Sequence, residues 1–295
     1  MRWFHEAVDG LHVALLRRIL PPVFRHGIDS PPLATHLTAV RLTLPALTAL
    51  CHYTVSAQAL IGEVVAGFQV RWGPQPDLPV IVYHHGIAEM PYDKSFRGIF
   101  RGALRTQAHL VAIRAPFHRH WLELLPGLGS MQHFLAMCAV AVHLGEAVRQ
   151  ALVARGAQGS MVVGTSLGGF LALVHHLMLG TADRYVPLLA GPDLAHVMLG
   201  THYRYFLAPQ ALAHAPMLQA LLDLRQALHM SDTRHVLPLL AQYDRDMVYG
   251  HHAACYAASG IPVVTIARGH LTGAFAFATL RTHVLACLQT LLQKR

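Results

Sequence analysis

The chain has 295 residues, of which 54% are hydrophobic and 13% are charged, and this composition excludes an intrinsically disordered protein. The length suits one large α/β domain that carries an insertion. The formal net charge is +8, but the arginines are scattered and there are only two lysines. We therefore expect a basic surface and no nucleic-acid partner.

Cysteine and histidine patterns give no sign of a disulfide framework or a metal site. The 23 histidines contain no HExxH motif, and the cysteines are far apart, at Cys51, Cys138, Cys255 and Cys287. No apolar stretch reaches the roughly 20 residues of a membrane span, and residues 1–20 do not have the pattern of a signal peptide. We expect a cytoplasmic protein that needs neither a metal nor an organic cofactor.

Residues 1–62 are predicted to form an N-terminal helical segment. An apolar stripe at spacings of three and four residues indicates an amphipathic helix that ends before Pro21 and Pro22, with the stripe at Phe4, Val8, Leu11, Leu15 and Ile19. We expect this helix to pack on the core or on a lid over it. Arg17 and Arg18 near its end allow an alternative, a helix lying on a membrane surface.

From residue 63 onwards, short apolar strands alternate with helices. Strands are expected at 63–72, 79–83, 108–113, 159–163, 185–190, 236–241 and 261–267, and helices at 95–104, 130–154, 167–179 and from 271 to the C-terminus. This alternation predicts a mostly parallel sheet with helices on both faces. The core would comprise residues 63–191 and 235–295, and the helical stretch 192–234 would be a cap inserted over one end of the sheet.

The sequence Gly164-Thr165-Ser166-Leu167-Gly168-Gly169 lies between an apolar strand and an apolar helix. It matches the G-x-S-x-G pattern in the strand-turn-helix context that this motif requires. Glycines two residues before and after Ser166 would let strand and helix approach closely, so that a strained turn exposes the serine hydroxyl. We predict Ser166 as a nucleophile.

These residues resemble the α/β-hydrolase superfamily, and most of all its esterases and lipases with an HHG or HGG loop; the resemblance covers residue 63 to the end. It implies an oxyanion hole made by the backbone N–H of Leu167 and an N–H from the loop after strand 79–83. His85-Gly86 matches the family's His-Gly pair there, so the second donor would be Ile87, with Gly86 as the alternative. His85 would brace the loop.

The family order of nucleophile, acid and histidine places the remaining two residues. His270 follows the last predicted strand and precedes a helix, so it is predicted as the base. The acid should follow strand 236–241. Asp244 fits the family's G-x-x-D pattern, with Ala241 in place of the glycine, and Asp246 is the alternative.

Together these residues predict a serine hydrolase that cleaves a carboxylic ester with a hydrophobic acyl group, through an acyl-serine intermediate and a Ser-Asp-His triad. Its partner would be a small-molecule ester. The sequence also allows an acyltransferase or a thioesterase with the same triad, and a non-catalytic binding protein on the hydrolase fold.

Overall fold

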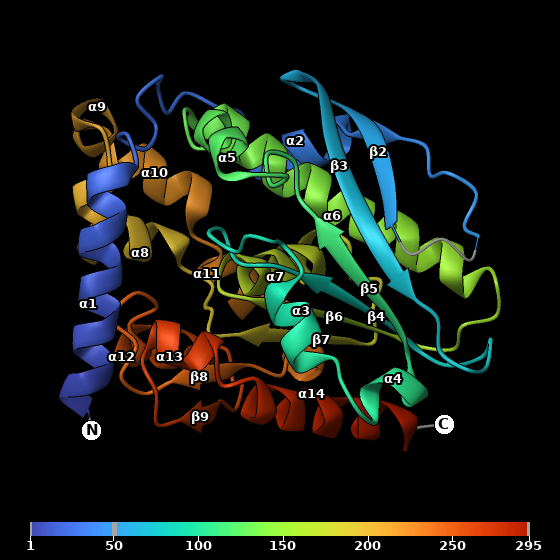
Figure 1. Ribbon diagram of the computed structural model, residues 1–295. Helices are drawn as coiled ribbons and strands as arrows, with labels where there is room; N and C mark the ends of the chain where they lie inside the picture. Colours follow the sequence, from blue (N-terminus) through green and yellow to red (C-terminus); the bar gives the residue numbers. More distant parts are fainter. Residues whose placement is uncertain (1, 49–51, 294–295) are drawn as a thin grey trace.

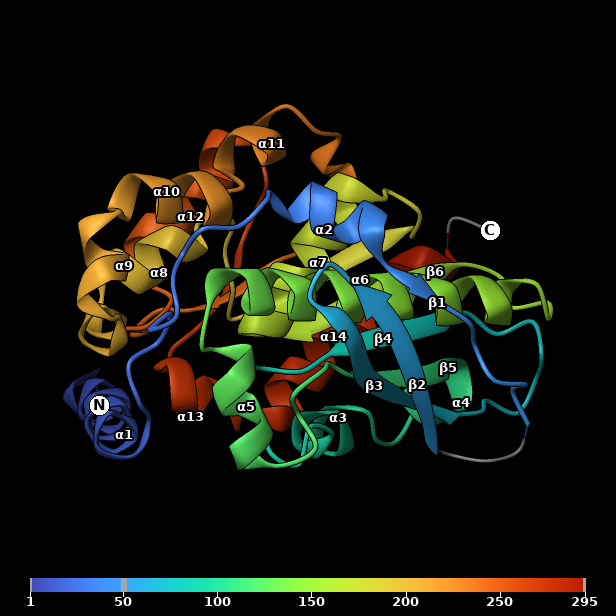
Figure 2. The ribbon, with the colours of Figure 1, turned by 90° about the horizontal axis from the view of Figure 1, so that it is seen from above.

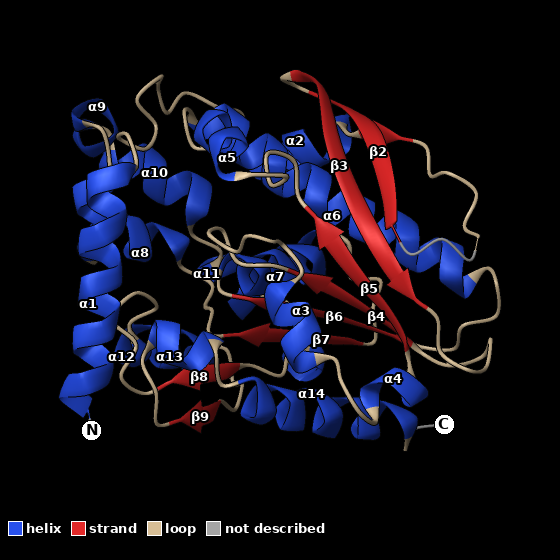
Figure 3. Cartoon of the chain, viewed as in Figure 1, coloured by secondary structure: helices blue, strands red, loops and turns tan. Residues whose placement is uncertain are grey.

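The computed structural model describes residues 2–48 and 52–293. Cys51, one of the four widely spaced cysteines, lies outside the described residues. In this part of the chain the strands form one sheet in the order β1-β2-β3-β5-β4-β6-β7-β8-β9. Helices cover both faces of this sheet (Figures 1 and 3). The three cysteines in the described residues are free thiols, at Cys138, Cys255 and Cys287.

The sheet is parallel over its larger part, as predicted. The strands from β4 onwards run parallel to one another, and β3 is antiparallel to β5. Their bounds are β3 (Gly62–Arg71), β4 (Val80–His84), β5 (His109–Arg114), β6 (Ser160–Thr165), β7 (Arg184–Leu188), β8 (Leu239–Ala241) and β9 (Val264–Ile266). The central strands β4, β6 and β7 are buried along their whole length, which is expected for a sheet covered on both faces.

Two apolar clusters hold the helices against the sheet. One face carries α2 (Leu33–Ala39), α6 (Met131–Val153) and α7 (Leu167–Met178), and the other carries α3 (Lys94–Ile99), α4 (Leu104–Gln107) and α14 (Phe277–Leu292). Ser130 caps α6 by accepting the N–H of His133. By length and composition α6 could cross a membrane. However, 78% of its most apolar 18-residue stretch is buried inside the protein, as is usual for a core helix.

The prediction of a wholly helical N-terminal segment is wrong for residues 41–42 and 52–59. These form β1 (Arg41–Leu42) and β2 (His52–Ala59), and β2 pairs with β3 in an antiparallel hairpin. Along β2 exposed and buried residues alternate strictly, which is the period of two that a strand with one covered face requires. Two predicted helices are also divided: α4 is separate from α3, and α13 (His270–Ala274) precedes α14.

Residues 192–234 form a group of short helices between β7 and β8. They are α8 (Leu194–Gly200), the 3-10 helix η1 (His202–Phe206), α9 (Pro209–Ala213), α10 (Ala215–Leu222), α11 (Arg225–His229) and η2 (Thr233–His235). In Figures 1 and 2, α8, α9 and α10 gather beyond one end of the sheet. The remaining helices are α5 (Trp121–Gly127) and α12 (Tyr249–Ala258).

The first helix, α1 (Arg2–Ile19), lies at this same end and packs on α13 and η1. Its buried residues are His5, Asp9 and Val13. Four of the five residues of the predicted apolar stripe are exposed: Phe4, Leu11, Leu15 and Ile19. The helix therefore packs on the protein, but the prediction of which side it packs with is wrong.

Candidate active site

Ser166 occupies a sharp turn between β6 and α7. Its backbone has φ 56° and ψ −121°, a left-handed conformation that is costly for any residue with a side chain. A Cβ atom at Gly164 would lie 2.0 Å from the carbonyl oxygen of Gly168, and one at Gly168 would lie 2.0 Å from the carbonyl oxygen of His84. The two glycines are thus required for the close approach that holds Ser166 at the end of the strand.

Two further side chains meet Ser166 at this edge of the sheet. The Oγ of Ser166 lies 3.0 Å from Nε2 of His270, and Nδ1 of His270 lies 2.7 Å from Oδ2 of Asp244. The other oxygen of Asp244 accepts the backbone N–H groups of Asp246 and Met247 at 2.8 and 2.7 Å. Asp244 is therefore fixed by its own loop, and it in turn fixes the imidazole ring that faces the serine.

Asp246, the alternative acid, does not reach His270 in this structure. Its Oδ2 lies 3.5 Å from the hydroxyl of Tyr203, and its Oδ1 is buried with no hydrogen-bond partner among the described residues. Burial raises the pKa of Asp246 to about 7. This carboxyl group thus gains a proton near neutral pH, whereas Asp244 is the one paired with the imidazole.

The charge state of His270 depends on two opposing influences. Burial alone would lower the pKa of His270, because it penalises the imidazolium form. The nearby carboxylates of Asp244, Asp246 and Asp9 outweigh burial and raise this pKa above its ordinary value. The surroundings therefore favour a positively charged imidazole, the form that a base acquires after taking a proton.

Asp9 of α1 is a neighbour of His270 that sequence reasoning missed. Its two carboxylate oxygens accept the backbone N–H groups of His270, at 2.8 Å, and of Leu271, at 3.0 Å. Asp9 is fully buried, and a Cβ atom at Gly269 would lie only 2.6 Å from its Oδ2. The first helix thus supplies the acceptors for the free N–H groups at the start of α13.

The loop after β4 is held by His85. Its Nδ1 lies 2.8 Å from the carbonyl oxygen of Gly86, and its Nε2 accepts the N–H of Ala115 at 3.2 Å. Burial holds the pKa of His85 well below its ordinary value, so the ring is neutral and one nitrogen donates while the other accepts. His85 therefore joins this loop to the end of β5.

The same loop distinguishes between the two proposed oxyanion donors. The N–H of Gly86 donates to the carboxylate of Glu89 at 3.3 Å and is therefore already paired. Among the described residues, 2–48 and 52–293, the structure shows no hydrogen-bond acceptor for the backbone N–H of Ile87 or of Leu167. Ile87 and Leu167 line a pocket together with Ser166, so their unpaired N–H groups are the candidate oxyanion donors.

A pocket of about 300 Å³ opens at Ser166 and His270. Its walls come from the loop after β4, from α13 and the residue after it, from η1, and from α1 through His12. Apolar side chains form much of the wall: Ile87, Met90, Leu271, Ala274 and Phe275. The pocket can therefore take a small molecule with an apolar part next to the serine hydroxyl.

No family model and no curated protein matches the chain. Solved structures do. An esterase from Pyrococcus furiosus is 10% identical with a TM-score of 0.56, over 89% of this chain and 97% of that one. Est1E from Butyrivibrio proteoclasticus is 13% identical with a TM-score of 0.52, over 77% and 96%. A putative dipeptidyl aminopeptidase IV from Bacteroides ovatus is 14% identical with a TM-score of 0.59, over 81% and 35%. The protein has the α/β-hydrolase fold.

In this α/β-hydrolase fold, Ser166, Asp244 and His270 follow the ends of β6, β8 and β9 in that order. Parallel strands bring their carboxyl ends to one edge of the sheet, which explains how residues more than 100 positions apart come together. The fold prediction is confirmed.

One group of side chains in the described part of the protein could hold a metal ion. It comprises His251, His252 and Cys255 of α12. His251 is already paired with Asp193 at 2.8 Å, and the cluster does not line the pocket at Ser166. The expectation that the chemistry at Ser166 uses no metal remains a prediction.

Proposed function

We propose that the protein is a serine hydrolase that cleaves a carboxylic ester with a hydrophobic acyl group. One observation carries this proposal: an unbroken chain of contacts from the hydroxyl of Ser166 through the ring of His270 to the carboxylate of Asp244. The strained turn at Ser166 and the two unpaired N–H groups beside it support the same chemistry.

In the first half of the reaction, Nε2 of His270 takes the proton of Ser166 as its Oγ attacks the ester carbonyl carbon. The carbonyl oxygen becomes an oxyanion that accepts the N–H groups of Ile87 and Leu167. Asp244 stabilises the imidazolium through Nδ1. When the tetrahedral intermediate collapses, the bond to the alcohol oxygen breaks, and His270 gives its proton to the departing alcohol.

In the second half, water replaces the alcohol. His270 takes a proton from a water molecule, whose oxygen attacks the acyl-serine carbonyl. Collapse of the second intermediate releases the carboxylic acid and returns the proton to Ser166 Oγ. His270 returns each proton that it accepts. The enzyme therefore ends the cycle unchanged, and the reaction consumes only the ester and water.

We also propose that residues 192–234 act as a cap on a core made of residues 63–191 and 235–295, together with β2. Tyr203 of η1 supports this role, since it lines the pocket at Ser166. The pocket's apolar wall supports the preference for a hydrophobic acyl group.

The proposal is tested by labelling the purified protein with a fluorophosphonate probe and mapping the modified peptide by mass spectrometry. We expect stoichiometric labelling at Ser166, because a hydroxyl beside a base in a free oxyanion hole attacks phosphorus as it would attack an ester carbonyl. Heat-unfolded protein, which lacks this geometry, should not react. A label on another residue, or none on the folded protein, would contradict the proposal.

A second test addresses Asp9 as a positioning residue. Replacing Asp9 with asparagine leaves one acceptor for two N–H groups, so His270 should lose its fixed position. We expect kcat to fall by about 10²-fold with little change in KM, as for a misplacement of about 1 Å. Removing the negative charge also destabilises the imidazolium, so the pKa of His270 should fall.

The pH profile separates this role from a loss of folding. Activity requires neutral His270, and therefore the acidic limb of kcat/KM should move to lower pH in Asp9→Asn. Asp29→Asn, at an exposed position in the segment before α2, is the matched control and should leave the profile unchanged. An unaltered profile and kcat in Asp9→Asn would show that Asp9 does not position His270.

A further inference from the structure

The outward face of α1 is apolar along its whole length. Five large side chains on this one helix are exposed: Trp3 by 73%, Phe4 by 50%, Leu11 by 73%, Leu15 by 56% and Ile19 by 68%. Phe4, Leu11 and Leu15 are separated by seven and four residues, so they lie above one another on one side of the helix. A soluble domain rarely leaves such a continuous apolar surface uncovered.

Charges on α1 complete this pattern. The two carboxylates are turned away from the outward face: Asp9 is buried, and Glu6 pairs with Arg2 at 2.8 Å. The exposed cations Arg17 and Arg18 follow the apolar stretch, and Arg17 lies over the ring of Tyr205. Arg18 therefore adds positive charge at the end of the apolar face, Arg17 lies at the border of this face with η1, and neither carboxylate of α1 belongs to it.

The orientation of α1 is fixed by polar contacts on its other side. Asp9 accepts two backbone N–H groups of α13, Nδ1 of His5 lies 2.9 Å from Oγ1 of Thr272, and the ring of His5 stacks on Tyr243. Rotating the helix to bury its apolar face would break all of these contacts and leave the backbone N–H groups of His270 and Leu271 without their acceptor. The exposed apolar face is thus part of the folded structure.

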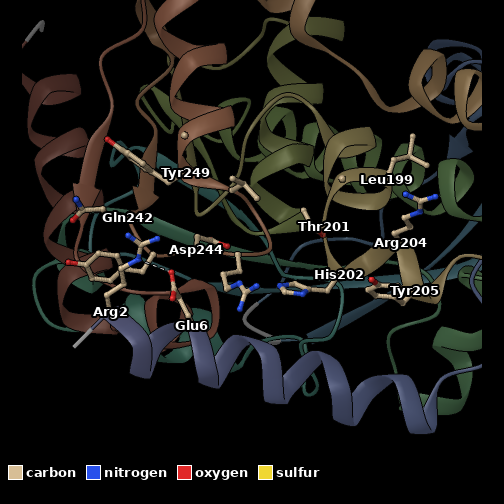
Figure 4. A pocket seen from close by; sticks show the side chains of 15 residues that line it. Arg2, Glu6, Leu199, Thr201, His202, Arg204, Tyr205, Gln242, Asp244 and Tyr249 are labelled. Atoms are coloured by element: carbon tan, nitrogen blue, oxygen red, sulfur yellow. Dashed lines mark hydrogen bonds and ion pairs between the residues drawn. The ribbon is translucent and has the colours of Figure 1, made fainter.

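Two views show what each side of the helix meets. In Figure 2, α1 is seen nearly end-on at a corner of the molecule, with its outer side facing away from the remaining elements. A wide, polar groove of about 830 Å³ lies on its other side. Figure 4 shows Arg2 and Glu6 projecting from α1 toward this groove. The apolar face is therefore the outermost surface at this end of the molecule.

We propose that α1 binds the protein to the surface of an anionic phospholipid bilayer. The helix would lie in the plane of the interface, with Phe4, Leu11 and Leu15 among the acyl chains and Arg17 and Arg18 at the phosphate groups. Exposed Trp3 suits the headgroup level, where tryptophan is enriched. The positive charge at the end of the apolar face is what favours an anionic membrane as the occupant over a second copy of this cationic chain.

The bound orientation would bring the candidate active site to the membrane. His12, on the flank of α1, lines the pocket at Ser166, and the exposed ring of Phe275 lies at the same pocket with Lys94 4.4 Å above it. If the proposed ester hydrolysis is correct, this pocket would receive its substrate from the lipid phase. The binding itself does not depend on that activity.

Vesicle flotation with the full-length protein tests the proposal. We expect the protein to float with vesicles of phosphatidylcholine and phosphatidylglycerol at 7:3 and to bind pure phosphatidylcholine more weakly. Leu11→Glu combined with Leu15→Glu should reduce binding at least about tenfold, because two apolar anchors become charged. Leu60→Glu combined with Met230→Glu, at exposed sites away from α1, is the matched control and should bind as the wild type does.

Two further measurements make the result decisive. With Trp72→Phe and Trp121→Phe in place, the fluorescence of Trp3 should shift to the blue when vesicles are added. Arg17→Glu combined with Arg18→Glu should abolish the preference for phosphatidylglycerol. Absent binding, equal binding by the Leu11/Leu15 variant, or a dimer in light scattering that this variant dissociates without any vesicle binding would overturn the proposal. None of these measurements uses catalysis, so they stand apart from the test at Ser166.

Discussion

Replacing Ser166 with alanine is expected to reduce the hydrolysis of p-nitrophenyl esters by about 10⁶-fold in kcat, to the level of the remaining binding and oxyanion contacts. The variant keeps the fold, since alanine preserves the Cβ in the turn and removes only the hydroxyl. His270 would then lose the group 3.0 Å from its Nε2 and would have no nucleophile to activate. Initial rates with a short-chain and a long-chain p-nitrophenyl ester measure the loss.

Ser130→Ala is the matched control for this experiment. It also removes one serine hydroxyl, but from the start of α6, where it caps the helix away from the pocket. We expect about 1 kcal/mol of lost stability and unchanged kcat. If Ser166→Ala hydrolysed esters as fast as the wild type, the proposed mechanism would be wrong.

Replacing Asp244 with asparagine has the second-largest expected effect, a fall in kcat of about 10⁴-fold. The asparagine can keep the position of the side chain, but it cannot stabilise a positive charge on His270, and its amide group favours the wrong tautomer of the ring. Steady-state kinetics with the same esters measure this loss, and thermal unfolding shows whether the loop remains intact.

Asp246→Asn provides the comparison that separates the two acids. Asp246 does not touch His270, and its carboxyl group gains a proton near pH 7, where asparagine is a close replacement. We expect it to lower kcat by less than about tenfold, because His270 loses a neighbouring charge but keeps its hydrogen bond to Asp244. A greater loss in Asp246→Asn than in Asp244→Asn would assign the acid to Asp246.

The sequence predicted the parallel part of the sheet because each strand there is a short, continuous apolar run between helices. In the hairpin of β2 and β3, the sequence predicted β3 as a strand but not β2. The alternation from His52 to Ala59 carries the signal, but polar residues at every second position hide it from a search for apolar runs. For α1, the spacing predicted an amphipathic helix but could not tell which side faces the protein.

In the candidate site, Ser166, Asp244 and His270 could be placed from the sequence because each follows a predicted strand in a known order. Asp9 could not, since its contact with His270 spans 261 positions and leaves no local pattern. The choice between Gly86 and Ile87 also needed the structure, because only the position of Glu89 shows that the N–H of Gly86 is already paired.

Because α1 meets different partners on its two sides, it could link membrane binding to the candidate active site. One side would be held by lipid, and the other holds the backbone at His270 through Asp9. If lipid binding stabilises α1 in this position, the contact of Asp9 with α13 must favour lipid binding by the same free energy, because coupling between two sites is reciprocal. The bilayer would then act as an effector of the proposed ester hydrolysis as well as the place where it occurs.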